Sequence, residues 1–153
     1  MRVFEPKRSS YRKKIKLVKI CEFCNPKNIK DQECKNLSGK YWLVLANKYP
    51  YMDGNLITVP RRHVENLTDL RDEEWCELRK IFINSKKKLS KIFKTDDFNI
   101  GLNLGRRAGA SIAHLHWQII PRNDKILNAS NVLADLYVIT VSPQDLKKII
   151  GKV

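Results

Sequence analysis

The chain has 153 residues, of which 42% are hydrophobic, so it is long enough to form one domain with a core of its own. No stretch approaches the roughly 18 consecutive apolar residues of a membrane span, and the N-terminus lacks the apolar segment of a signal peptide, so we expect a cytoplasmic protein that makes no use of a membrane. The net charge of +14, from 30 basic and 16 acidic residues, favours polyanionic partners such as nucleic acid or polyphosphates.

Much of this charge lies in two basic runs. The first, residues 7–16, belongs to an irregular stretch, and we predict a basic N-terminal arm over residues 1–20 followed by a single domain over residues 21–153. The arm could bind nucleic acid or serve only solubility, and its sequence does not separate the two. The second run, residues 86–94, closes a predicted helix, where lysines complement the helix dipole and face solvent.

The first part of the domain predicts a β-hairpin. Residues 41–46 form a continuously apolar run, which is typical of a buried strand. Asp53 and Gly54 then mark a turn. Residues 56–59 give a second strand, which Pro60 stops.

A long helix is predicted over residues 72–93. Acidic residues occupy its first turn, and apolar side chains recur at helical spacing along one face. The predicted members of this buried face are Trp75, Leu78, Phe82, Leu89 and Phe93.

Three more strands and a short helix complete the predicted elements. The strands cover residues 98–104, 114–120 and 137–141, and Ser142 with Asp145 predicts the N-terminal cap of a C-terminal helix. We therefore expect an α+β fold, in which a five-stranded antiparallel sheet has one long helix packed across one face and a short C-terminal helix.

The segment from His114 to Ile120 combines strand alternation with two of the chain's three histidines. Because side chains on a strand alternate between faces, His114, His116 and Gln118 should share one face. Two aligned imidazoles can bind a metal, attack phosphorus, or do one each. The alternative is an amphipathic strand whose polar face is simply in water.

A basic loop marked by glycines precedes this segment. Gly105 and Gly109 allow the backbone to approach a ligand closely. Arg106 and Arg107, which lie between them, suit phosphate oxygens. A polar-faced strand next to such a loop indicates a site that handles phosphate.

Cys21 and Cys24 have the Cys-x-x-Cys spacing of a zinc knuckle, which presents two thiolates to one tetrahedral ion and needs two further ligands. In a cytosolic protein a disulfide is not expected, and the polar stretch that follows does not fit the strand–turn–helix setting of a redox motif. His63 and one of the strand histidines would complete a Cys2His2 site. Cys34 could be a third thiolate ligand, and Cys76 is expected to be a small buried side chain of the long helix.

Together these motifs resemble the histidine-triad (HIT) family over roughly residues 20–122. The residues from His114 to Ile120 are similar to the family's motif, residues 45–64 to its first hairpin, and residues 101–105 and 108–111 to its phosphate loop. The resemblance implies a homodimer that binds nucleotides and performs nucleotidyl chemistry at an α-phosphorus.

The resemblance also implies roles for individual residues. His116 would be the nucleophile that forms a covalent nucleotidyl-imidazole, and Asn47 would contact the ribose. The residues expected to hold phosphates, from the resemblance or from the loop composition, are Asn103, Arg106, Arg107, Gly109 and Ser111. In zinc-bearing members, similar to galactose-1-phosphate uridylyltransferase, the ligands of a structural ion match Cys21, Cys24, His63 and His114.

Gln118 stands where hydrolytic members of the family carry a third histidine, whereas the transferase branch and some diadenosine polyphosphate phosphorylases carry glutamine. A nucleotidyl-histidine must be broken by a second nucleophile, and glutamine cannot be the general base from which water benefits. Inorganic phosphate is already anionic and needs no such base, while the Gln118 amide can still donate a hydrogen bond to a phosphoryl oxygen. Asn55 and Ala110 depart from the histidine and the glutamine that many relatives carry.

These observations predict a nucleotidyltransferase that cleaves dinucleoside polyphosphates, such as diadenosine tetraphosphate, by phosphorolysis. His116 would attack, Gln118 and the phosphate-loop residues would hold the developing charge, and structural zinc on His114 would orient His116. Two alternatives remain open. One is a family hydrolase of dinucleoside polyphosphates or nucleoside phosphoramidates, and the other is a zinc-stabilised basic protein that binds nucleic acid.

Overall fold

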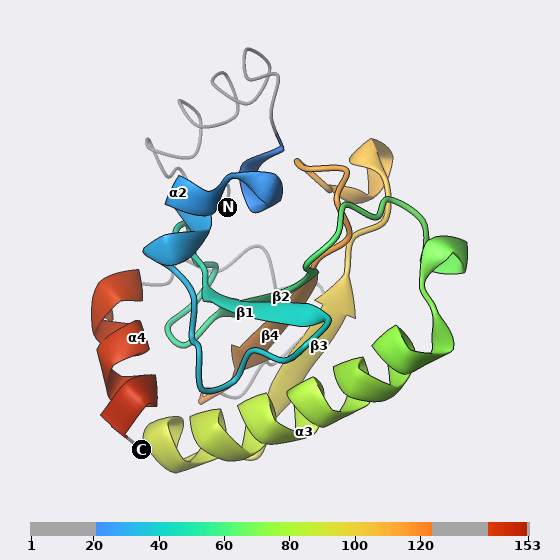
Figure 1. Cartoon of the computed structure of the whole chain (residues 1–153). Helices are drawn as coiled ribbons and strands as arrows, with labels where there is room; N and C mark the ends of the chain where they lie inside the picture. Colours follow the sequence, from blue (N-terminus) through green and yellow to red (C-terminus); the bar gives the residue numbers. More distant parts are fainter. Residues whose placement is uncertain (1–20, 124–140, 153) are drawn as a thin grey trace.

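A computed structural model describes residues 21–123 and 141–152 and shows an antiparallel sheet with a long helix across one face (Figure 1). The strands are ordered β1-β2-β4-β3. Their bounds are β1 Trp42–Ala46, β2 Leu56–Pro60, β3 Phe98–Leu102 and β4 Trp117–Pro121. The helices are α2 Pro26–Lys30, α3 Asp72–Phe93 and α4 Pro143–Lys152, and the 3-10 turns are η1 Glu22–Cys24, η2 Leu67–Asp69 and η3 Arg106–Ala108.

Several predicted elements are confirmed. β1 and β2 pair as an antiparallel hairpin, and α3 spans the predicted residues 72–93. The cap of α4 also forms, because the Ser142 hydroxyl accepts the backbone N–H of Asp145 at 3.1 Å and donates to the Asp145 carboxylate at 2.7 Å. Within the described residues, no helix is long and apolar enough to cross a membrane.

The described sheet has four strands rather than the predicted five. The fifth was predicted over residues 137–141, of which residues 137–140 lie outside the described part of the chain, and Val141 is not in a strand. The basic arm predicted over residues 1–20 also lies outside it.

The buried face of α3 is shifted slightly from the predicted one. Its fully buried apolar residues are Leu78, Ile81 and Leu89. Trp75, which was predicted to be buried, is 40% exposed because it lies at the border of this face. Cys76 is exposed, so its prediction as a buried side chain is wrong.

The two faces of the sheet have separate apolar clusters, which is why β1 is apolar at every position. Trp42 and Val44 belong to the large cluster beneath α3, whereas Leu43 and Leu45 belong to a smaller cluster on the opposite face. Figure 1 shows η1 and the loop between β3 and β4 on that opposite side of the sheet. The candidate site lies there.

β4 begins at Trp117, three residues later than predicted. The cause is Pro60, the residue that ends β2, which has no N–H to donate to the strand ladder. The Pro60 carbonyl accepts a hydrogen bond from the His114 ring at 3.1 Å instead, and the backbone N–H of Leu115 donates to the carbonyl of Val64 at 2.7 Å. The motif histidines therefore lie in a segment anchored beyond the end of the sheet.

Candidate functional site

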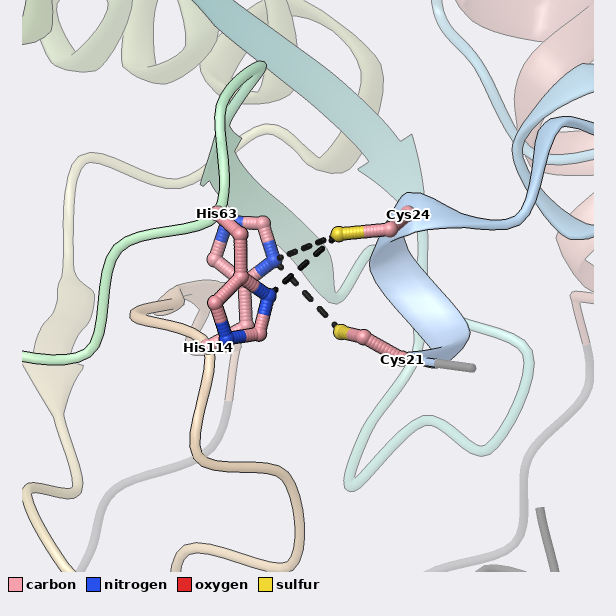
Figure 2. A group of neighbouring side chains, drawn as sticks. All are labelled: Cys21, Cys24, His63 and His114. Atoms are coloured by element: carbon pink, nitrogen blue, oxygen red, sulfur yellow. Dashed lines mark hydrogen bonds between the residues drawn. The ribbon is translucent and has the colours of Figure 1, made fainter. Parts of the chain in front are cut away.

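Two cysteines and two histidines from three distant segments meet at one point (Figure 2). Cys21 and Cys24 come from the η1 turn, His63 follows β2, and His114 precedes β4. One sulfur or ring nitrogen from each lies within 4.8 Å of the others. These are the four residues that the sequence predicted as metal ligands, and they could hold a metal ion.

The hydrogen bonds of the two histidines determine which ring nitrogen points into the cluster. His114 Nε2 lies 3.1 Å from the Pro60 carbonyl, an obligatory acceptor, so Nε2 carries the proton and Nδ1 keeps its lone pair. His63 Nε2 likewise lies 3.0 Å from the Glu65 carboxylate. Both rings therefore turn Nδ1 toward the cysteines, which is the arrangement that orients metal-binding histidines.

The distances within the cluster fit a tetrahedral zinc ion. Zn–S bonds of about 2.3 Å and Zn–N bonds of about 2.0–2.1 Å place tetrahedral sulfur and nitrogen ligands about 3.5–3.6 Å apart. The His63 Nδ1 atom lies 3.3 Å from the Cys24 sulfur, and the His114 Nδ1 atom lies 3.6 Å from both sulfurs. The donor set thus fits zinc with little rearrangement.

Burial shifts the pKa of one thiol and one imidazole of this cluster. It raises the pKa of Cys21 to about 11 and lowers the pKa of His114 to about 4, with His63 adding to the latter shift. The imidazole is therefore neutral, as a metal ligand must be, while a binding ion would displace the thiol proton. Cys34 is buried in the core beneath α3 and does not join the cluster, so its role as a third thiolate ligand is excluded.

The segment that carries His63 is tied to the start of α3. The Arg62 guanidinium donates two hydrogen bonds of 2.7 Å to the two carboxylate oxygens of Glu74, which is buried. This contact holds the pKa of the Glu74 carboxyl below its usual range. Glu74 also accepts the backbone N–H of Arg71 at 2.8 Å. The ion pair therefore fixes the end of the β2 connection against the helix.

A cavity next to the cluster is lined by residues from the first hairpin, the β3–β4 loop and the start of β4. Six of the residues that the sequence predicted as catalytic or nucleotide-binding lie on its walls. They are Asn47, Asn103, Gly109, Ser111, His116 and Gln118.

The arginines of the loop do not line this cavity. Arg106 and Arg107 form η3 and are exposed, so the structure does not bring them together with the other predicted phosphate-binding residues. The loop turns back through Gly105 and Gly109, whose φ angles of 84° and 98° lie in the region that favours glycine. The cation on the cavity wall is Lys48, which follows Asn47 and was not predicted.

His116 presents one nitrogen to the cavity. Its Nδ1 donates to the backbone carbonyl of His114 at 2.9 Å, so Nε2 carries the lone pair. Burial lowers the pKa of His116, which keeps the ring neutral and nucleophilic. The ring of Phe23 packs against it with the centroids 5.2 Å apart.

Phe23 links the metal cluster to the cavity and was missed by the sequence analysis. It lies between Cys21 and Cys24, so any ion that fixes the two thiolates also fixes the aromatic side chain between them. Phe23 and its neighbour Glu22 both line the cavity. The sequence feature that could have indicated this role is the position of Phe23 inside the Cys-x-x-Cys turn.

Comparisons with known proteins show the family to which the chain belongs. The HIT domain family model matches residues 35–125. A relative from Mycobacterium tuberculosis (strain CDC 1551 / Oshkosh), named AP-4-A phosphorylase, is 34% identical over 114 residues, which are 74% of this chain and 58% of the relative. A relative from Saccharomyces cerevisiae (strain YJM789), named Bis(5'-adenosyl)-triphosphatase, is 35% identical over 97 residues, which are 63% of this chain and 47% of the relative. The chain thus spans about half the length of these curated relatives.

Among solved structures, the crystal structure of a Zn-bound histidine triad family protein from Mycobacterium smegmatis has the same fold. It matches with a TM-score of 0.62 at 14% identity and covers 94% of this chain and 90% of that chain. The family model matches more than half of the chain, and His116 of the motif lines a cavity beside the sheet. The chain therefore belongs to the HIT domain family.

Proposed function

We propose that this protein is a nucleotidyltransferase that cleaves dinucleoside polyphosphates at the α-phosphorus and uses inorganic phosphate as the acceptor. The observation that carries the proposal is the state of His116: the ring is neutral, its Nδ1 is engaged by the His114 carbonyl at 2.9 Å, and its Nε2 is left for the cavity. The relative named AP-4-A phosphorylase, 34% identical, supports the choice of substrate.

The reaction takes two displacements. In the first, His116 Nε2 forms a bond to the α-phosphorus while the bond from that phosphorus to the bridging oxygen breaks, and a nucleoside polyphosphate leaves. In the second, an oxygen of inorganic phosphate attacks the same phosphorus, the P–N bond breaks, and a nucleoside diphosphate leaves with His116 restored. Diadenosine tetraphosphate would therefore give ATP and ADP.

Gln118 favours phosphate over water as the acceptor. It follows His116 by two residues on the same wall of the cavity, where it can donate hydrogen bonds but cannot remove a proton from water. The backbone near Gly109 and the side chains of Asn103 and Ser111 would share the phosphoryl charge with it.

Zinc on Cys21, Cys24, His63 and His114 would be structural. The bound ion would supply no reactive water, because the four side chains complete its tetrahedron. It would hold the η1 turn against the segment that carries His116. The Zn-bound histidine triad family protein that shares this fold supports the assignment.

Separation of the products tests the acceptor. Purified protein is incubated with diadenosine tetraphosphate, with and without inorganic phosphate. We expect ADP and ATP only in the tube that contains phosphate. ATP and AMP in the tube without phosphate would contradict phosphorolysis, and the matched Gln118→His variant should shift the products in that direction because it regains a proton acceptor.

Hydrolysis is the second candidate function. It is favoured by the relative named Bis(5'-adenosyl)-triphosphatase, which is 35% identical over the matched residues. Water would then break the nucleotidyl-histidine bond without help from Gln118, and the same incubation would give AMP with no need for phosphate.

A homodimer is proposed to form through the edge strand β3. Among the described strands, β3 has a neighbour on one side only. Three large apolar side chains are exposed, which are Ile100 of β3 at 42%, Leu104 just after it at 48% and Ile83 of α3 at 54%. We expect light scattering to give the mass of two chains. Ile100→Lys should shift the mass toward that of one chain at the same concentration. If the double variant Ile83→Lys/Ile100→Lys still had the mass of a dimer, this surface would be excluded as the interface.

A further inference from the structure

A buried asparagine connects the ribose side of the cavity to the phosphoryl side. Asn55 is 0% exposed and begins the connection into β2. Its amide nitrogen lies 2.8 Å from the side-chain oxygen of Gln118, and its amide oxygen lies 2.7 Å from the side-chain nitrogen of Asn47. Asn47 and Gln118 both line the cavity, whereas Asn55 does not.

Backbone groups fix which end of the Asn55 amide faces which neighbour. The backbone N–H of Tyr51 can only donate, and it lies 3.2 Å from Asn55 Oδ1. The carbonyl of Leu56 can only accept, and it lies 3.0 Å from Asn55 Nδ2. A flipped amide would put donor against donor and acceptor against acceptor, so the observed orientation is the stable one.

The side-chain amide of Asn47 is fixed in the same sense, with its oxygen toward the backbone and its NH2 group toward the next amide. The backbone N–H of Tyr49 donates to Asn47 Oδ1 at 2.9 Å, which leaves Asn47 Nδ2 to donate to Asn55. All three amides are therefore ordered in one direction, from the hairpin loop toward Gln118. Asn55 uses both of its N–H groups and both lone pairs within this chain of hydrogen bonds and has none left for a ligand.

We propose that Asn55 is a positioning residue that makes Gln118 a hydrogen-bond donor toward the substrate. Because Asn55 donates to Gln118 Oε1, the carbonyl end of Gln118 is held in the protein and its NH2 group is turned away from Asn55. The neighbour of Gln118 across β3 is Gly101, and a side chain built there would meet nothing within 4 Å. The NH2 group thus has open space on this side, and Gln118 lines the same cavity as His116.

This orientation matters for an anionic substrate. An NH2 group stabilises a non-bridging phosphoryl oxygen as charge develops, whereas the carbonyl oxygen of a flipped glutamine would repel it. The catalytic part of the inference rests on the proposed nucleotidyl transfer. The polarity of the amide chain does not, and it can be measured without turnover.

Asn55→Asp tests the inference most directly. The carboxylate keeps the acceptor for Tyr51 and Asn47 but cannot donate, so Gln118 should flip and turn its oxygen to the cavity. We expect kcat to fall about 10²-fold, the loss typical of one oxyanion donor, with KM changed only a few-fold. Asn55→Leu removes all four hydrogen bonds but leaves Gln118 free to turn, so it should retain more activity than Asn55→Asp.

The order of these two variants separates positioning from a structural role. If Asn55 only held the loop together, Asn55→Leu would be the worse variant, and that result would overturn the proposal. Gln118→Glu keeps Asn55 but replaces the NH2 group of Gln118 with an oxygen that cannot donate, so its kcat should match that of Asn55→Asp. Full activity of Gln118→Glu would also overturn the proposal. This variant keeps the test valid if Asn55→Asp does not fold.

A spectroscopic measurement is independent of turnover. With ¹⁵N-labelled protein and AMP as the probe, the side-chain NH2 resonances of Gln118 should shift on binding in the wild type. They should not shift in Asn55→Asp, where the NH2 group is turned toward the carboxylate. Equal shifts in both proteins would refute the assigned polarity, even if no dinucleoside polyphosphate were cleaved and the proposed function itself failed.

Discussion

His116→Ala is expected to abolish cleavage of dinucleoside polyphosphates while leaving the fold intact. Removal of a covalent nucleophile lowers kcat by at least about 10³-fold, because no other group forms the intermediate. The fold should survive because the ring borders a cavity, where it contacts Phe23 and the His114 carbonyl. We expect the free energy of unfolding to fall by about 1–2 kcal/mol.

The measurement combines kinetics with detection of the intermediate. Wild-type protein mixed with diadenosine tetraphosphate in the absence of phosphate should carry one adenylyl group, located on His116 by peptide mapping, and His116→Ala should carry none. Asn103→Ala is the matched control: it should slow the reaction, because Asn103 would help hold the phosphoryl charge, but it should still carry the adenylyl group on His116. An adenylyl group on His116→Ala, or full activity of that variant, would show that the mechanism is wrong.

The elements that sequence reasoning could predict are those specified by short-range patterns. Apolar spacing and acidic first-turn residues located α3 at residues 72–93, and an apolar run with a turn located the β1–β2 hairpin. The spacing of Cys21 and Cys24 and the scarcity of histidines predicted a site with His63 and one motif histidine, and the family resemblance implied that this histidine is His114.

What the sequence could not predict depends on contacts between distant segments. The strand pattern placed His114 in β4, but the missing N–H of Pro60 ends the ladder before it. The two loop arginines looked suited to phosphate, yet the turn through Gly105 and Gly109 leaves them exposed, and Lys48 lies on the cavity wall instead.

Asn55 shows the same limit at the level of single hydrogen bonds. From the sequence it was only a departure from the histidine of many relatives. Its importance emerges from four hydrogen-bond partners, which are Asn47, Tyr51, Leu56 and Gln118, and the contact with Gln118 spans 63 positions. No local pattern can indicate the contact with Gln118, because it depends on how β2 of the hairpin pairs with β4.

Loss of the metal is expected to destabilise the protein far more than loss of an ordinary surface cysteine. A zinc ion would join three segments that lie far apart in the sequence, so its removal should lower the free energy of unfolding by at least about 3 kcal/mol and the melting temperature by about 10 °C. We expect one zinc ion per chain by elemental analysis in the wild type and less in Cys24→Ser.

Cys76→Ser is the matched control, because Cys76 is exposed on α3 outside the cluster. Equal zinc content and equal melting temperature in the two variants would exclude the site.

The metal should also control the nucleotide cavity, although none of its four ligands lines it. Cys21 and Cys24 flank Phe23, whose ring packs 5.2 Å from the ring of His116. Without the ion, the thiolates no longer hold the η1 turn, so this wall of the cavity loses its fixed position and His116 loses its aromatic contact. Cys24→Ser should therefore bind AMP about 10-fold more weakly than Cys76→Ser at a temperature where both are folded, a difference that corresponds to about 1.4 kcal/mol. Equal affinities would show that the cavity wall is stable without the metal.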